Sequence, residues 1–111
     1  MADFIPTPKI GDILREEFME PLNISAYKLA KDISVPTSRI QDILHDRRKI
    51  TPDTSVRLGI YFGVSEEYFL KMQNDIEMRE IHLSHKDELD RIRAVACTIA
   101  MKHTDRIVFK N

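Results

Sequence analysis

The chain has 111 residues, of which 42% are hydrophobic and 32% charged, and its formal net charge is −1. This length leaves room for one compact domain and a terminal extension, and the hydrophobic share excludes a disordered chain. No apolar run approaches the roughly 20 residues that cross a bilayer. The first eight residues lack a secretory signal, and the single cysteine, Cys97, excludes an intramolecular disulfide. We therefore expect a cytoplasmic protein with no membrane partner.

The charge is distributed unevenly along the chain. Residues 25–49 hold six basic and three acidic residues, a net charge of +3, whereas residues 65–90 carry −5 and residues 91–111 carry +4. Neutralisation of phosphates supplies much of the affinity of a protein for nucleic acid. The central basic segment is therefore the candidate for such a contact, although a solvated charged face would look the same.

Hydrophobic residues at helical spacing predict three short helices in the first half of the chain. The first runs from about Lys9 to Glu20 and ends before Pro21, which cannot continue a helix. Ser25 is a suitable N-cap for a second helix, and Pro36 suits the first turn of a third. The residues expected to face inward are Ile10, Ile13, Leu14, Phe18, Ala26, Leu29, Ala30, Ile33, Ile40, Ile43 and Leu44.

Capping signals predict a fourth and a fifth helix. Thr51, Pro52 and Asp53 form a cap, a first-turn proline and an acid at the positive end of the helix dipole. This fourth helix ends at Gly63, and Ser65 opens the fifth. The expected buried residues of the two helices are Val56, Leu58, Phe62, Tyr68, Phe69, Met72 and Ile76.

A sixth helix is predicted in the C-terminal part. Ser84 and Asp87 resemble a capping box, and an apolar stripe of Leu89, Ile92, Val95, Ala96 and Ile99 follows. Cys97 lies along this stripe, where we expect a small buried hydrophobe. Residues 106–110 read as a short strand or a frayed tail.

The second and third helices form the segment that carries the function. Residues 25–48 read SAYKLAKDISVPTSRIQDILHDRR, two short helices with about three residues between them, which is a helix-turn-helix unit. The residues that fill the wedge between the helices are Leu29, Ile33, Val35, Ile40 and Ile43. Burying them leaves Thr37, Ser38, Arg39, Gln41 and Asp42 pointing outward. A short polar helix face of this kind fits the major groove of B-DNA.

Four blocks in order make the pattern specific: IGDILREEFMEPLNIS, LAKDISVPTSRIQDIL, RRKITPDTSVRLGIYFGVS and EEYFLKMQ. On these blocks the chain, from Pro8 to about Asp75, resembles the HigA-type antitoxins, also called VapI proteins, of the XRE (Cro/C1-type) helix-turn-helix family. The resemblance implies an all-α fold with a five-helix phage-repressor-like DNA-binding domain over residues 8–75. Residues 76–111 would form a C-terminal helical extension that serves for dimerisation or as a tail.

The resemblance also implies which residues meet DNA. Base contacts are expected from Thr37, Ser38, Arg39 and Asp42, with Arg39 reaching a base or a phosphate. Phosphate contacts, which position the protein without reading sequence, are expected from Ser25, Tyr27, Arg47, Arg48 and Lys49. The alternative for residues 47–49 is a solvated loop that caps helix dipoles.

Several residues depart from the family pattern. Ser34 and Asp46 stand where glycine is common, and glycine enters the left-handed backbone region freely. Asp46 also directs a negative charge toward the DNA side, which weakens the attraction of phosphates. Ile10 replaces a common proline, and Tyr68 with Phe69 a common tryptophan.

The expected partners follow from the resemblance and from the reading of DNA by symmetric dimers. We expect a homodimer on a palindromic operator in double-stranded DNA, and a HigB-like toxin, which is a ribonuclease, as protein partner. A stand-alone transcriptional regulator, or an adaptor that has lost DNA binding, remains open. No catalytic motif is found, so we expect neither an enzyme nor a cofactor. His82 and His85 have a spacing that suits a metal, but surface histidines are the favoured interpretation.

Overall fold

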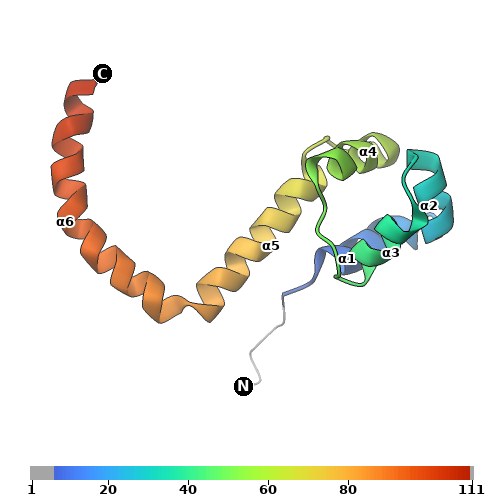
Figure 1. Cartoon of the computed structure of the whole chain (residues 1–111), viewed down its shortest axis with the longest axis horizontal. Coiled ribbons are helices and arrows are strands. Elements are labelled where there is room, and N and C mark those ends of the chain that lie inside the picture. Colours follow the sequence, from blue (N-terminus) through green and yellow to red (C-terminus); the bar gives the residue numbers. More distant parts are fainter. Residues whose placement is uncertain (1–6, 111) are drawn as a thin grey trace. The chain divides into compact units, whose positions relative to one another are not determined.

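The computed structural model describes residues 7–110, and side chains up to residue 99. Every regular element in this range is helical (Figure 1): α1 (Ile10–Ile13), η1 (Leu14–Met19), α2 (Ala26–Ile33), α3 (Thr37–Leu44), α4 (Pro52–Phe62), α5 (Tyr68–Ser84) and α6 (Lys86–Lys110). The chain divides into two compact units, residues 1–78 and 79–111. Among the described residues, no helix is both long and apolar enough to cross a membrane.

The first predicted helix is present but changes its winding. It is α-helical over α1 and becomes a π-helix over η1, in which Glu20 N donates to Arg15 O at 2.8 Å. A π-helix bonds residues five apart and so brings them onto one face. Leu14 and Met19, which are five residues apart, are both buried for this reason. The helical segment ends before Pro21, as expected.

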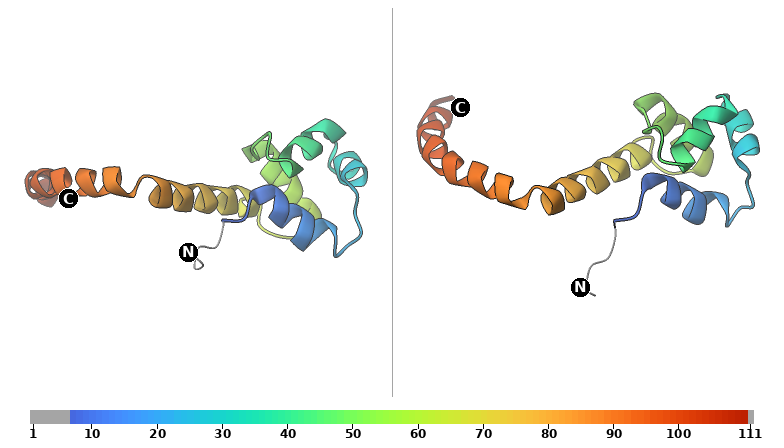
Figure 2. Two further views of the ribbon diagram at one scale, coloured as in Figure 1. Left: turned by 90° about the horizontal axis from the view of Figure 1, so that it is seen from below. Right: turned by 60° about the horizontal axis from the view of Figure 1, so that its bottom comes forward.

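The predicted caps of α2 and α4 are confirmed. Ser25 Oγ accepts a hydrogen bond from Lys28 N at 3.0 Å, and Thr51 Oγ1 accepts one from Thr54 N at 3.3 Å. α4 ends at Gly63, which has a left-handed backbone with φ of 74°. α3 contacts both α1 and α2, and Figures 1 and 2 show α2 and α3 joined by a short turn.

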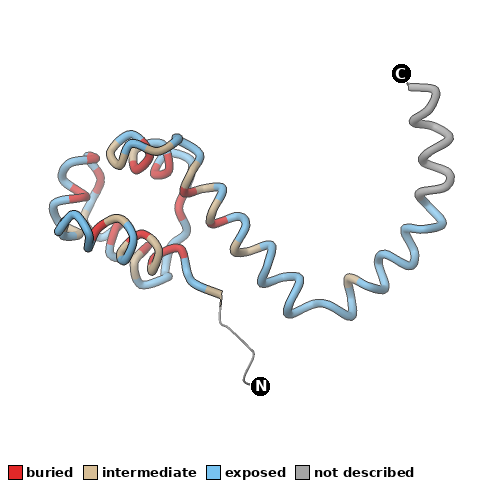
Figure 3. Tube along the Cα trace, turned by 180° about the vertical axis from the view of Figure 1, so that it is seen from behind, coloured by how far each residue is buried: buried red, intermediate tan, exposed pale blue. Residues whose placement is uncertain are grey.

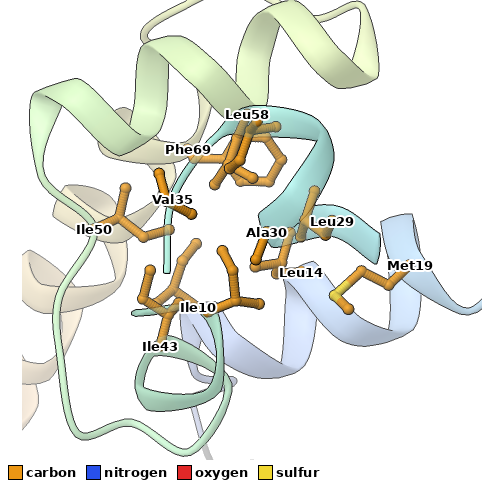
Figure 4. Close-up of a cluster of buried hydrophobic side chains, with 12 residues drawn as sticks. Ile10, Leu14, Met19, Leu29, Ala30, Val35, Ile43, Ile50, Leu58 and Phe69 are labelled. Atoms are coloured by element: carbon orange, nitrogen blue, oxygen red, sulfur yellow. The ribbon is translucent and has the colours of Figure 1, made fainter. Parts of the chain in front are cut away.

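One hydrophobic core holds residues 7–78 together. Figure 3 shows that the buried positions gather in α1 to α4 and the first turns of α5, and Figure 4 shows their side chains converging. The buried apolar residues are Ile10, Leu14, Met19, Leu29, Ala30, Ile33, Val35, Ile40, Ile43, Ile50, Leu58 and Phe69. Phe18 packs against this core, with its ring centroid 4.9 Å from that of Phe69. Nearly all of the expected core is present.

The buried face of α4 differs from the prediction at Val56, which is exposed. Ser55 is buried in its place, because its Oγ donates to Glu66 O at 2.7 Å and accepts from Leu70 N at 3.1 Å. Gly59 lies on the same face, where an added Cβ would be only 2.5 Å from Ser65 O. Backbone contact with the start of α5 therefore orients α4 together with the apolar packing of Leu58.

Three expectations for the C-terminal part are wrong. Ser84 does not cap a new helix, because α5 runs to Ser84 and its Oγ donates to Glu80 O at 2.8 Å. Cys97 is exposed rather than buried, since within residues 79–99 no second element covers this helix. Residues 106–110 are neither a strand nor a frayed tail but the last turns of α6.

Candidate nucleic-acid interface

The turn between α2 and α3 fixes the angle of the helix-turn-helix unit. Ser34 adopts the left-handed backbone with φ of 62°, and Val35, which follows it, is buried. Val35 N donates to Ala30 O at 3.0 Å, which satisfies a carbonyl at the end of α2. Serine thus occupies the conformation for which the family commonly uses glycine.

α3 presents an outward polar face. Its inward residues Ile40 and Ile43 are fully buried, whereas Ser38 and Gln41 are exposed. The predicted base-contact residues Thr37, Arg39 and Asp42 are half-buried on the same helix. The four residues predicted to read bases therefore lie on one short helix whose other side is part of the core, and their contacts with DNA stay a prediction.

The end of α3 is held firmly against α1. Gly11 approaches so closely that an added Cβ would lie 2.5 Å from Ile43 O. Arg15 donates to Leu44 O at 2.7 Å and also pairs with Asp12 at 3.1 Å. The hydrogen bond from Arg15 satisfies the last carbonyl of α3, and together these contacts fix where the following loop begins.

The basic loop after α3 is exposed. Asp46 has a left-handed backbone with φ of 61°, and Arg47, Arg48 and Lys49 are all exposed. Ser25 and Tyr27, the other predicted phosphate contacts, lie at the start of α2, where Tyr27 is 66% exposed. The nine predicted residues thus lie on α2, α3 and the loop after α3, and their contacts with DNA stay a prediction.

Carboxylates form ion pairs with much of this basic surface, and of these acids the sequence analysis singled out only Asp46 as an opposing charge. Three ion pairs join predicted contact residues to acids: Arg47 to Asp42 at 3.1 Å, Arg39 to Asp53 at 3.3 Å and Lys49 to Glu77 at 2.9 Å. A fourth pair joins Asp46 of the same loop to Lys9 at 3.2 Å. Arg47 and Asp42 are five residues apart, but the other pairs span from 14 to 37 residues of the chain. Such long-range pairs have no local sequence signal.

Arg48 and Arg39 differ in the salt bridges and hydrogen bonds that their side chains form. Arg48 has no salt bridge or side-chain hydrogen bond within residues 7–99. The Nε of Arg39 is buried without a hydrogen-bond partner among the described residues, so one ion pair holds its guanidinium. Neither arginine is committed to a strong internal contact.

Arg57 is a supporting residue that the sequence reading missed. Its Nε donates to Asp53 at 3.1 Å, and its Nη1 donates to Ile33 O at 2.8 Å. Arg57 therefore ties α4 to the C-terminal end of α2 and keeps Asp53 beside Arg39. The i, i+4 spacing of Asp53 and Arg57 was the signal that could have found this contact.

Comparison with known proteins identifies the family. A model of the helix-turn-helix family matches residues 16–69. Virulence-associated protein I (VapI) of Dichelobacter nodosus is 44% identical over 78 residues, covering 68% of this chain and 72% of the relative. The chain belongs to the VapI and HigA family of helix-turn-helix proteins. A further relative is YbaQ of Escherichia coli, an uncharacterised helix-turn-helix transcriptional regulator, 29% identical over 94 residues and 83% of each chain.

A solved member of the VapI and HigA family has the same fold. The structure of the Pseudomonas aeruginosa antitoxin HigA with the higBA promoter superposes with a TM-score of 0.71 and 27% identity, covering 78% of this chain and 94% of that one. The all-helical architecture predicted from the sequence is therefore that of the HigA antitoxins.

Proposed function

We propose that this protein is a DNA-binding antitoxin of a type II toxin–antitoxin module, which represses its own operon and neutralises a HigB-like ribonuclease toxin. The observation that carries the proposal is the outward polar face of α3, directly followed by an exposed loop with three basic residues. The likeness to a HigA antitoxin solved with its promoter supports the same use of this surface.

In this proposal residues 8–75 form the DNA-binding domain. Thr37, Ser38, Arg39 and Asp42 contact base edges in the major groove. Ser25, Tyr27, Arg47, Arg48 and Lys49 hold the DNA backbone. Of the acids paired with these basic residues, Asp53 is exposed and Asp42 and Glu77 are half-buried. Ion pairs this accessible to solvent are weak, so phosphate oxygens can replace the carboxylates on binding.

The first test is a gel-shift titration of the pure protein against the DNA directly upstream of its gene. We expect tight binding that weakens with salt and survives an excess of random competitor DNA. Binding no tighter than that to random DNA would contradict repression by the protein alone.

Substitutions of Arg48 and Arg47 test the proposed contacts with the phosphates of the DNA backbone. We expect Arg48→Ala to weaken binding to specific and random duplexes alike and to lower the salt slope by about one. Arg47→Ala has a smaller effect, because Arg47 must first leave Asp42. Fluorescence anisotropy at several salt concentrations measures both slopes, and equal affinities in wild type and Arg48→Ala would remove Arg48 from the interface.

The toxin partner is tested by copurification. The acidic stretches 12–20 and 66–80 are the candidate surfaces, since opposite charges steer association with a basic ribonuclease. We expect the tagged protein to retain the product of the neighbouring small open reading frame and to suppress its ribonuclease activity. An antitoxin role is excluded if the two coexpressed products never associate.

The alternative is a stand-alone regulator of the same fold, which the likeness to YbaQ favours. The two functions share the DNA-binding surface and differ only in the presence of a toxin. A gene neighbourhood without a small ribonuclease gene, together with a positive gel shift, would support the regulator.

A further inference from the structure

Gln73 of α5 is a buried polar residue that lies outside the helix-turn-helix unit. It is only 8% exposed, and its side-chain amide bonds both backbone groups of Ile50. Ile50 N donates to Gln73 Oε1 at 2.7 Å, and Gln73 Nε2 donates to Ile50 O at 2.9 Å. Because Ile50 is itself buried, the end of the basic loop is fixed to α5.

Glu77 lies one helical turn after Gln73 and therefore on the same face of α5. Its Oε2 is 2.9 Å from Lys49 Nζ, and Lys49 directly precedes the fixed residue Ile50. The hydrogen bond that Lys49 donates to Glu77 is the main cause that raises the pKa of Lys49 above its ordinary value, so the pair stabilises the charged ammonium form. Gln73 thus holds the loop where Lys49 meets a carboxylate instead of open solvent.

We propose that α5 regulates the basic loop: Gln73 positions it, and Glu77 competes with DNA phosphate for Lys49. A carboxylate and a phosphate oxygen both accept charge-assisted hydrogen bonds from a lysine ammonium. The negative charge of Glu77 also repels a phosphate that approaches the same group, so Lys49 must leave Glu77 before it binds DNA. This inference rests on the proposed function, because the competition requires a loop that contacts DNA.

The test compares charge removal at two neighbouring positions of α5. Glu77→Gln removes the competing charge, and Asp75→Asn is the matched control. Asp75 pairs with Lys71 at 3.4 Å on the same helix but contacts no residue of the loop. Both variants change the net charge equally, so long-range attraction to DNA rises equally in both. Only Glu77→Gln releases Lys49.

Binding is measured by fluorescence anisotropy with a duplex that covers the DNA upstream of the gene. From the usual strength of exposed pairs, we expect Glu77→Gln to bind about 2- to 5-fold more tightly than Asp75→Asn. In a Lys49→Ala background the same substitution should give no gain beyond the control. Thermal unfolding verifies that all variants fold.

The outcomes separate this inference from the proposed function. If wild type does not bind the duplex, repression by the protein alone is contradicted, and the competition at Lys49, which requires DNA binding, is refuted with it. If wild type binds but Glu77→Gln and Asp75→Asn have the same affinity, or Glu77→Gln is weaker, only the competition is refuted. A gain that persists without Lys49 also refutes it, because the gain would then come from another contact.

Discussion

Asn23, Ser34 and Asp46 hold a left-handed backbone, with φ of 56°, 62° and 61°. This conformation costs an L-residue energy, and asparagine and aspartate tolerate it better than serine. Ser34 is therefore the most strained of the three, and it lies at the turn that sets the angle between α2 and α3. Strain at this position lowers the stability of the whole helix-turn-helix unit.

Replacing Ser34 with glycine should relieve this strain. Glycine has more conformational freedom in the unfolded chain, which offsets part of the relieved strain. We expect Ser34→Gly to raise the free energy of unfolding by a net amount of about 0.5–1 kcal/mol. Urea denaturation measures the change, and Ser34→Ala, which keeps a Cβ, should show no such gain. A glycine variant less stable than wild type would show that the serine conformation is unstrained.

Tyr61 provides a pH-dependent contact between α4 and α2. Its hydroxyl donates to Asp32 at 2.7 Å, and Lys28 donates to the same carboxylate at 2.9 Å. The hydrogen bond from Tyr61, followed by that from Lys28, holds the pKa of Asp32 below its ordinary value of 3.8. A lowered carboxyl pKa stabilises the fold above that ordinary value, and the stabilisation is lost as the pH falls through the folded-state pKa.

Tyr61→Phe removes the main cause of the Asp32 shift. We expect the variant to be less stable than wild type at neutral pH, and the difference to shrink once the pH falls below 3.8. Urea denaturation at neutral and at acid pH tests this, and a difference of equal size at both would contradict the assignment.

At the scale of helices, local signals predict what local contacts determine. Ser25, Thr51 and Gly63 marked the ends of α2 and α4 correctly, because a cap acts within a single turn. The π-helical turn of η1 and the exposure of Val56 depend on packing with other elements and left no such mark.

The candidate site also has some features that local sequence patterns predict and others that depend on packing between elements. The outward residues of α3 could be predicted from helical periodicity, because burial of Ile40 and Ile43 decides which face remains. The acids that pair with the basic residues, and the role of Gln73, depend on contacts between residues that are distant in sequence. A single sequence carries no pattern for such contacts.

α5 is tied to the basic loop by a contact that needs one acceptor and one donor on the same side chain. Ile50 presents one donor and one acceptor, and the Gln73 amide matches both in a single orientation. Gln73→Glu keeps the acceptor but, when ionised, offers no donor to Ile50 O. We expect a loss of about 1–3 kcal/mol in the free energy of unfolding at neutral pH.

The loss in Gln73→Glu should shrink toward acid pH, where the protonated carboxyl group donates again. Thermal unfolding across this range tests the expectation, with Asn74→Asp, an exposed neighbour, as the control. Equal stability of Gln73→Glu and wild type at neutral pH would mean that the two hydrogen bonds contribute nothing.

At the scale of the whole molecule, the homodimer expected from the sequence requires a surface that a second copy covers. Ile92, Val95 and Ile99 of α6 are 61%, 62% and 60% exposed, and they line an apolar groove together with Ile81 and Leu89.

Ile92→Lys places a charge within this groove and should prevent dimerisation. We expect the mass in sedimentation equilibrium to fall to the 13.0 kDa of one chain, and binding to a palindromic operator to weaken. Ala94→Lys adds the same charge on the opposite face of α6 and should remain dimeric. A groove variant that stays dimeric would place the dimer interface elsewhere.

The separation of α3 into a buried side and an outward side has a consequence for evolution. Ser38 and Gln41 contribute nothing to the core, so substitutions there leave the fold intact. After a gene duplication, two copies could acquire different operator preferences through a few such substitutions, with no compensating change elsewhere in the chain. One genome could thus hold several modules of this family, each insulated from the promoters of the others.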